Sequence, residues 1–171
     1  MFLDLWKHKS IKRNIEKLVA RSGRSSFSST IKSVGILVDL TAFDTVKRLE
    51  KMALRLGDNI SVSVLLYNDI ENKKEDENLF FNDKAISFNG KIKEDKVTAF
   101  ISKPFDLLLS YYNRENLVLQ FVTAGSQAHF KVGFPLQMYQ LNDLTIHVDL
   151  QNSSAFEAEL LKYLKILNRI E

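Results

Sequence analysis

Short polar side chains follow the apolar segments of this chain at four places, and their spacing suggests a shared site. These residues are Asp39 and Thr41, Asn68, Asn113, and Asp149 with Asn152. In open parallel sheets, ligands bind beyond the carboxyl ends of the strands. Asp39 and Asp149 have the chemistry to bind a cation or exchange protons there. The competing interpretation, which we favour, is that each side chain caps the turn or helix that follows it.

The histidines do not form a metal-binding pattern. The chain has three of them, His8, His129 and His147, and none is paired at a spacing of four residues with another ligand type. Cysteine is absent, so thiolate zinc sites and disulfide bonds are excluded. We therefore expect no metal site.

One short segment combines a serine, a histidine and a lysine, namely Ser126, His129 and Lys131. A Ser–His pair is typical of hydrolases. A nucleophile elbow, however, requires glycines on both sides of the serine, and the sequence Gly125-Ser126-Gln127-Ala128 has only the first of them. We do not expect Ser126 to be catalytic.

Glycine-rich phosphate loops are missing as well. Neither the GxGxxG nor the GxxxxGK[ST] pattern occurs, and the six glycines are scattered. This argues against a dinucleotide-binding or P-loop enzyme, so we expect no cofactor.

The positive charge is concentrated at the N-terminus. Residues 1–24 contain seven Lys or Arg and two acids, a net charge of +5, whereas the remainder carries −2. Such an arm could bind RNA, a ribonucleoprotein or an anionic membrane surface. The alternative is an ordinary solvated helix face. The candidate polyanion contacts are Lys9, Lys12, Arg13, Lys17 and Arg21.

The arm is predicted to be an amphipathic helix over residues 9–21. Ile11, Ile15, Leu18 and Val19 recur at helical spacing and form one apolar stripe. If this stripe packs on the domain, most of the cations must face solvent. Binding of such a ridge to polyanions would weaken as salt rises.

The rest of the chain alternates between predicted strands and helices. The apolar, β-branched runs are typical of buried parallel strands and cover residues 34–39, 60–67, 105–111, 130–134 and 144–149. Helices are predicted from capping patterns after Thr41, after Asn113 and after Ser154. The pattern predicts an α/β fold with a mostly parallel open sheet of about five strands, in a Rossmann-like three-layer arrangement.

Residues 69–96 are dominated by charges. Within them Asn89-Gly90 suits the turn of a hairpin over residues 85–92, and one irregular strand with a loop is the alternative.

Length and composition favour a single domain. The 171 residues are 45% hydrophobic and 26% charged, which is the balance of a globular protein. We divide the chain into a basic helical arm, residues 1–24, and one α/β domain, residues 25–171. Neither a signal peptide nor a membrane-spanning apolar run is evident, so we expect a cytoplasmic protein.

The segment from Phe105 to Phe134 is the most distinctive part of the sequence. It reads Phe-Asp-Leu-Leu-Leu, then a predicted helix containing Asn116, then Ser126-x-Ala-x-Phe-Lys-Val-Gly-Phe134. It resembles an uncharacterised bacterial family of small single-domain proteins, a resemblance that covers most of the chain and implies no activity. Over about thirty residues it is also similar to the N-terminal half of heptosyltransferase-like glycosyltransferases. Those enzymes bind nucleotide sugar mainly through a second Rossmann-like domain.

Two functions remain open from the sequence. We favour a non-catalytic binding or adaptor domain that uses its basic N-terminal helix. The alternative is a small α/β enzyme, or an inactive relative of one, with a transferase-like polar site at the strand ends.

Overall fold

The computed structural model describes residues 2–21, 30–69, 80–87, 89–137 and 139–170. Its helices are α1 (Phe2–Arg21), α2 (Val46–Leu54), α3 (Asp95–Ser102), α4 (Leu117–Gly125) and α5 (Ser153–Ile166). Its strands are β1 (Ser33–Asp39), β2 (Ser61–Tyr67), β3 (Phe80–Phe81), β4 (Leu107–Tyr111), β5 (Lys131–Gly133) and β6 (Leu144–Thr145).

The strands form one sheet in the order β3-β2-β1-β4-β5-β6, and every neighbouring pair is parallel. In the centre, Val34 of β1 is aligned with Val62 of β2 and with Leu107 of β4. This is the strand order of dinucleotide-binding folds, and it changes direction between β1 and β4. The predicted α/β class is confirmed, with six strands where about five were expected.

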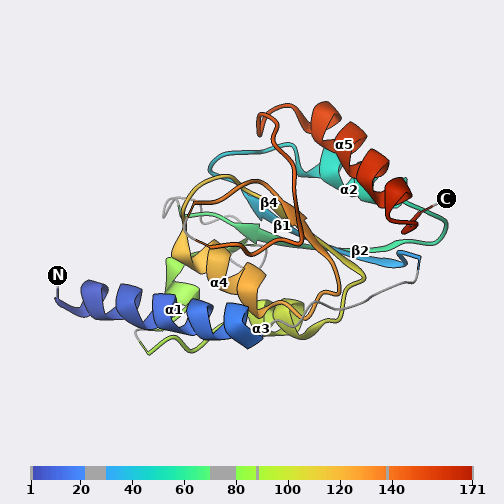
Figure 1. The fold of residues 1–171 in the computed structure, drawn as a ribbon. Coiled ribbons are helices and arrows are strands. Elements are labelled where there is room, and N and C mark those ends of the chain that lie inside the picture. The colour runs from blue at the N-terminus through green and yellow to red at the C-terminus, as the bar shows by residue number, and fades with distance from the viewer. Residues whose placement is uncertain (1, 22–29, 70–79, 88, 138, 171) are drawn as a thin grey trace.

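Helices cover both faces of the sheet (Figure 1). Successive residues of a strand point to opposite faces. Ile36 and Val38 of β1 therefore join the core beneath α2 and α5, whereas Leu37 joins the core beneath α1, α3 and α4. The chain thus has two apolar cores, one on each side of the sheet, as a three-layer fold requires.

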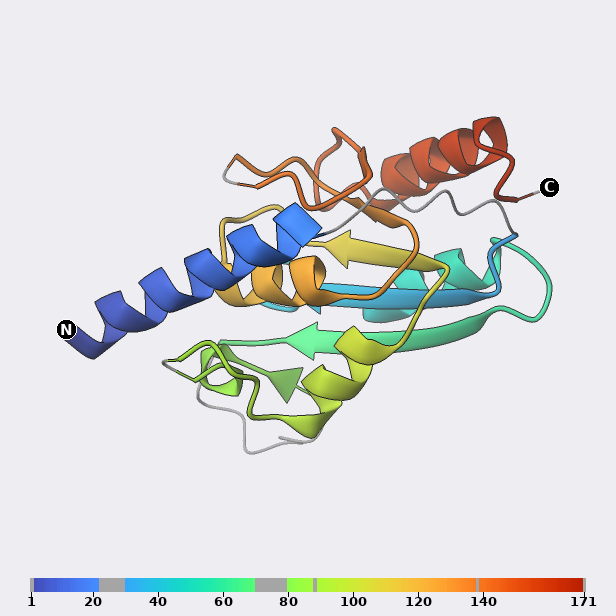
Figure 2. The same cartoon turned by 60° about the horizontal axis from the view of Figure 1, so that its bottom comes forward.

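Helix α1 is longer than predicted and packs against α4, as two views of the ribbon show (Figures 1 and 2). Ile11 and Ile15 are completely buried in the core of that face, and Leu18 and Val19 pack partly against it. The apolar stripe predicted from the sequence is therefore the packing face of this helix.

The turn that contains Gly90 lies against α1. Gly90 has a φ of +76°, which favours glycine, and a Cβ at this position would collide with Asn14 Nδ2. The hairpin expected over residues 85–92 is reduced to one antiparallel bridge between Ile86 and Ile92, and residue 88 lies outside the described residues.

Further elements differ from their sequence-based predictions. The helix expected after Thr41 begins only at Val46, because Thr41 bonds to Asp39 and does not cap a helix. The strand expected over residues 144–149 ends at Thr145, which leaves His147 exposed and outside the core. Helix α3 was not predicted, because its eight residues contribute only Val97 and Phe100 to the core.

None of the helices in the described part of the chain is long and apolar enough to cross a bilayer.

Candidate functional site

The ends of β1 and β4 lie side by side where the strand order changes direction, and an ion pair connects them. Asp39, the last residue of β1, is fully buried. Arg114 follows β4 and donates to both carboxylate oxygens of Asp39, from Nε to Oδ2 and from Nη2 to Oδ1 at 3.3 Å. The Arg114 Nη2 also donates to Asp69 Oδ2 at 3.2 Å. The crevice where dinucleotide-binding folds place their ligand is therefore bridged by protein side chains.

Both oxygens of the Asp39 carboxylate have protein donors. Besides Arg114, the backbone N–H and the hydroxyl of Thr41 donate to Oδ1 at 3.0 and 2.6 Å. Burial by itself lowers the pKa of Arg114, but the bonds and charges of Asp39 and Asp69 outweigh that effect and raise it. The guanidinium is thus permanently charged. This charge suits a structural ion pair with Asp39 and excludes proton transfer by Arg114.

A second polar cluster lies beside this pair and is centred on Tyr67. The buried Tyr67 hydroxyl donates to Asp83 Oδ1 at 2.6 Å and accepts from Asn116 Nδ2 at 2.9 Å. Burial, followed by the bond to Asp83 and its charge, raises the pKa of Tyr67 above its ordinary value. The phenol therefore stays protonated and connects β2, the turn at Asp83 and the start of α4.

The structure brings only some of the predicted strand-end residues together. Asp39 and Thr41 are in contact, and the backbone N–H of Asn68 donates to the Phe81 carbonyl at 2.9 Å on the β3 side. Asp149 is exposed and accepts from the Gln151 N–H at 2.8 Å, so its carboxylate does not share a partner with Asp39.

The other two predicted asparagines, Asn113 and Asn152, have different roles. Asn152 caps α5 by accepting from the Ala155 N–H at 3.0 Å. Asn113, predicted to cap the helix after β4, is exposed, and that prediction is wrong. The cap of α4 is Asn116, whose Oδ1 accepts from the N–H groups of Val118 and Leu119, both at 2.9 Å.

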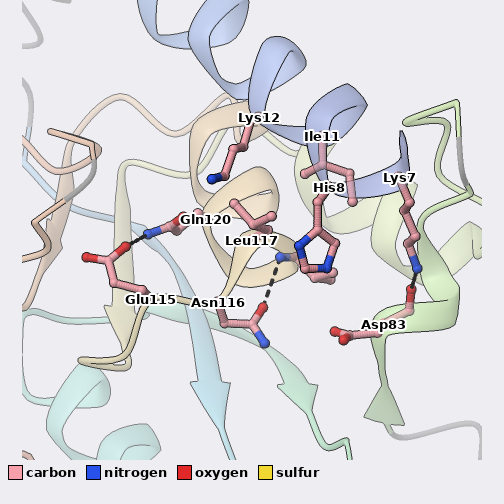
Figure 3. A pocket seen from close by; sticks show the side chains of 10 residues that line it. Lys7, His8, Ile11, Lys12, Asp83, Glu115, Asn116, Leu117 and Gln120 are labelled. Carbon is pink, nitrogen blue, oxygen red and sulfur yellow. Dashed lines mark hydrogen bonds between the residues drawn. The ribbon is translucent and has the colours of Figure 1, made fainter. Parts of the chain in front are cut away.

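A cavity of about 280 Å³ lies between α1 and the N-terminus of α4 (Figure 3). Its lining combines cationic groups from α1 with acidic and amide groups from the strand-end side. Figure 3 shows His8 and Lys12 on the side of α1 that faces α4, whereas Lys7 reaches toward Asp83. On the other side the lining includes Asp83, Glu115, Asn116 and Gln120.

The predicted polyanion contacts on α1 are exposed. They are Lys9, Lys12, Arg13, Lys17 and Arg21, of which Lys12 also lines the cavity. Leu5 and Trp6 precede them and are 64% and 70% exposed. Ile11 and Ile15 on the side that packs on the domain are instead buried, whereas Lys9, Arg13 and Lys17 form a basic outer face.

The Ser126, His129 and Lys131 segment lines a larger cavity of about 770 Å³. Its groups have structural partners: Ser126 Oγ accepts from the Ala128 N–H at 3.2 Å, and Lys131 Nζ donates to the carbonyls of Thr123 and Ala124 at 2.9 and 3.4 Å. Burial lowers the pKa of Lys131, against the opposing charge of Asp143. Lys131 thus satisfies carbonyls at the C-terminus of α4.

Several residues of these sites were not identified from the sequence. Arg114 and Gln120 lie in unremarkable sequence contexts, and Asp69 and Asp83 lie in a run of charges where no one residue is distinguished. Among the described residues, no three His, Asp or Glu side chains lie close enough to hold a metal ion.

The fold and these contacts define a Rossmann-like α/β protein whose strand-end crevice is closed by Asp39 and Arg114. The sequence profile described as "Family of unknown function (DUF6913)" matches residues 7–167. The chain belongs to this family, which agrees with the resemblance to an uncharacterised family. No curated protein and no solved structure matches the chain.

Proposed function

We propose that this protein is a binding domain that docks on an anionic membrane surface through the outer face of α1. One observation carries the proposal: Leu5 and Trp6 are largely exposed on the same helix as five exposed cations. Amphipathic helices with these two components lie in the membrane interface, with apolar residues at the acyl boundary and cations among the lipid headgroups.

Helical geometry places Trp6 and three of these cations on one side of α1. Trp6, Lys9, Arg13 and Lys17 are separated by three or four residues, so they are neighbours along one helix face. The N-terminal end of α1 also extends beyond the rest of the ribbon in both views (Figures 1 and 2). A flat surface could therefore approach this end of the helix.

The exposed leucine favours a membrane over RNA. Tryptophan could stack on an RNA base or insert at the level of lipid headgroups. Leu5 has no comparable role with RNA, whereas an aliphatic side chain gains free energy when it leaves water for the acyl boundary. Binding to RNA or to a ribonucleoprotein would need only the cations. The experiment below distinguishes such binding from membrane docking.

The expected affinity is low. A cation near an anionic leaflet contributes about 1 kcal/mol. Five cations less the exposed Glu16 on the same helix leave four effective charges, hence about 4 kcal/mol and a dissociation constant near 1 mM before Trp6 contributes. Such docking is reversible. The anionic leaflet faces the cytoplasm, so the proposal places the protein in that compartment.

Trp6 is the sole tryptophan of the chain, so its fluorescence reports directly on the docking face. We expect a blue shift with vesicles of phosphatidylcholine and phosphatidylglycerol at low salt, and none with phosphatidylcholine alone. Raising the salt should reverse the shift, because exposed charges are screened.

Variants separate the two components of the surface. Reversing Lys9, Arg13 and Lys17 to Glu should abolish co-sedimentation with anionic vesicles, and Lys12 is left unchanged because it also lines the cavity. The matched control reverses Lys47, Lys51 and Lys165, which are exposed on α2 and α5, and should still bind. Equal loss in both variants, or binding to single-stranded RNA at salt concentrations that release vesicles, contradicts membrane docking.

A further inference from the structure

We propose that two copies of this chain associate through the outer edge of β2 and the neighbouring flank of α2, so that their sheets join in a two-fold dimer. The inference involves neither α1 nor the polar strand ends, and it therefore goes beyond the proposed membrane docking. It rests on backbone groups that face outward from β2, on the length of edge that they occupy, and on the side chains beside that edge.

The backbone groups of β2 point alternately toward β1 and away from it. The Ser61 N–H donates to the carbonyl of the residue before β1, and the Tyr67 carbonyl accepts from the residue after β1, both at 2.9 Å. Residues between them that are an even number of positions from Ser61 also face β1. The N–H and C=O groups of Val62 and Val64 therefore point to the other side of the strand.

Strand β3 covers only the last part of this outward edge (Figure 2). Its first residue, Phe80, is aligned with Leu66 of β2. Among the residues that the structure describes, no strand pairs with β2 on that side from Ser61 to Leu65. Natural proteins usually protect such an edge with charged residues or proline, and the sequence Ser-Val-Ser-Val-Leu contains neither. This edge is therefore open to a further strand.

The flank of α2 nearest this edge carries an exposed apolar residue. Arg48 and Arg55 extend from α2 to α5 with hydrogen bonds of 2.6 and 2.7 Å. Val46, Glu50 and Leu54 lie four residues apart on the opposite flank of the helix. Since α2 packs over β1 and β2, this second flank faces the β2 edge, and Leu54 is 54% exposed there.

A second β2 fits the open edge when it runs antiparallel about a two-fold axis at Ser63. Val62 of each copy then pairs with Val64 of the other, and each of these two pairs exchanges both of its backbone hydrogen bonds. The paired segment ends at Leu65, one residue before the position where β3 begins opposite Leu66. The contact is isologous, because the same surface serves both copies.

The side chains beside the paired strands favour a second copy over an unrelated peptide. Val62 and Val64 are half-buried in the core beneath α2, and Leu54 adds an exposed apolar group on the same face of the sheet. The two α2 helices run antiparallel in the dimer. A contact centred between Glu50 and Lys51 pairs opposite charges across the axis, which an arbitrary peptide does not supply.

Disulfide trapping tests the register, because the chain has no cysteine of its own. Ser63→Cys places a thiol at the axis, in a pair without mutual hydrogen bonds whose Cα atoms lie about 4.5 Å apart, within disulfide range. Ser61→Cys is the matched control on the same strand and face, since its two copies lie about 13 Å apart along the strands. Mild oxidation should give a covalent dimer about tenfold faster or more from Ser63→Cys. Equal rates, or no dimer from either variant, overturn the proposal.

Sedimentation equilibrium measures the association of the unsubstituted chain, and we expect monomer and dimer in exchange. Leu54→Glu should weaken dimerisation about tenfold or more, because a two-fold interface contains each substitution twice. Val64→Pro removes an N–H that β1 does not use and should weaken it too, with circular dichroism as the check on folding. Ile166→Glu is the matched control, because Ile166 is 65% exposed on α5, and it should leave dimerisation unchanged.

A monomer at every concentration, or equal weakening by Leu54→Glu and Ile166→Glu, contradicts the proposed interface. Neither experiment contains vesicles or alters α1. Failure of this dimer and failure of membrane docking are therefore distinguishable.

Discussion

The guanidinium of Arg114 donates to both carboxylate oxygens of Asp39, and this contact joins residues 75 positions apart at the centre of the sheet. Asp39 has no exposed surface, whereas the Arg114 side chain is 39% exposed. The pair is therefore a buried carboxylate neutralised by a half-exposed cation. It lies where dinucleotide-binding folds leave a crevice for a ligand, and it connects the end of β1 to the segment that follows β4.

Replacing Arg114 with Met should destabilise the protein, because it leaves a buried, uncompensated carboxylate. We expect a loss of about 3 kcal/mol, the lower end of the range for breaking a buried ion pair, because water can reach the vacated position. Urea unfolding measures this loss. The double variant with Asp39→Asn should recover part of it, and Arg13→Met on the exposed face of α1 should change stability by less than about 0.5 kcal/mol. If Arg114→Met also changed the free energy of unfolding by less than about 0.5 kcal/mol, the Asp39–Arg114 ion pair would not be needed for stability.

Replacing Asn116 with Ala should destabilise α4, because the helix loses the acceptor for two N–H groups. The expected cost is about 1 kcal/mol or somewhat more, since the contact with the Tyr67 hydroxyl is lost too. Asn113→Ala is the matched control, because Asn113 is the same residue type three positions earlier and is exposed. Thermal unfolding of both variants decides the assignment: a larger effect for Asn113 would place the cap there.

Replacing Leu160 or Leu164 with Ala should cost about 2–5 kcal/mol. Both side chains are completely buried between α5 and the sheet, so truncation removes apolar contacts and leaves a cavity. Ile166 belongs to the same helix and is 65% exposed, so Ile166→Ala should have little effect. Chemical denaturation gives all three values, and a loss below about 1 kcal/mol for both leucines would contradict the packing of α5.

Stability should fall at alkaline pH in part through Tyr111. Burial raises its pKa from 10.0 to about 12, with Arg48 opposing and Asp149 adding to the shift. The unfolded chain thus loses this proton first, and the contribution of Tyr111 is complete below pH 10 and is lost as pH rises toward 12. The difference in unfolding free energy between wild type and Tyr111→Phe should therefore shrink over this interval. A constant difference would show that the phenol titrates normally in the folded protein.

The regular spacing of apolar residues along the sequence predicted the elements that are long enough to show such a repeat. The stripe from Ile11 to Val19 packs against the domain as predicted, because a helix that covers an apolar core must repeat its apolar residues every three or four positions. The short strand β3 and helix α3 were not predicted. Strand β6 was predicted with wrong bounds. Elements of two to eight residues are stabilised by their neighbours more than by their own pattern.

The sequence by itself determined the α/β class, the apolar stripe of α1 and the concentration of positive charge on that helix, because composition and spacing are properties of the chain alone. Only the tertiary structure decided which polar residues meet. Asp39 pairs with Arg114, and Asp149 does not join it, because the sheet order sets neighbours that sequence distance cannot reveal. The same holds for Asn116, which caps α4 and meets the Tyr67 hydroxyl only because β2 and α4 are brought together by the fold.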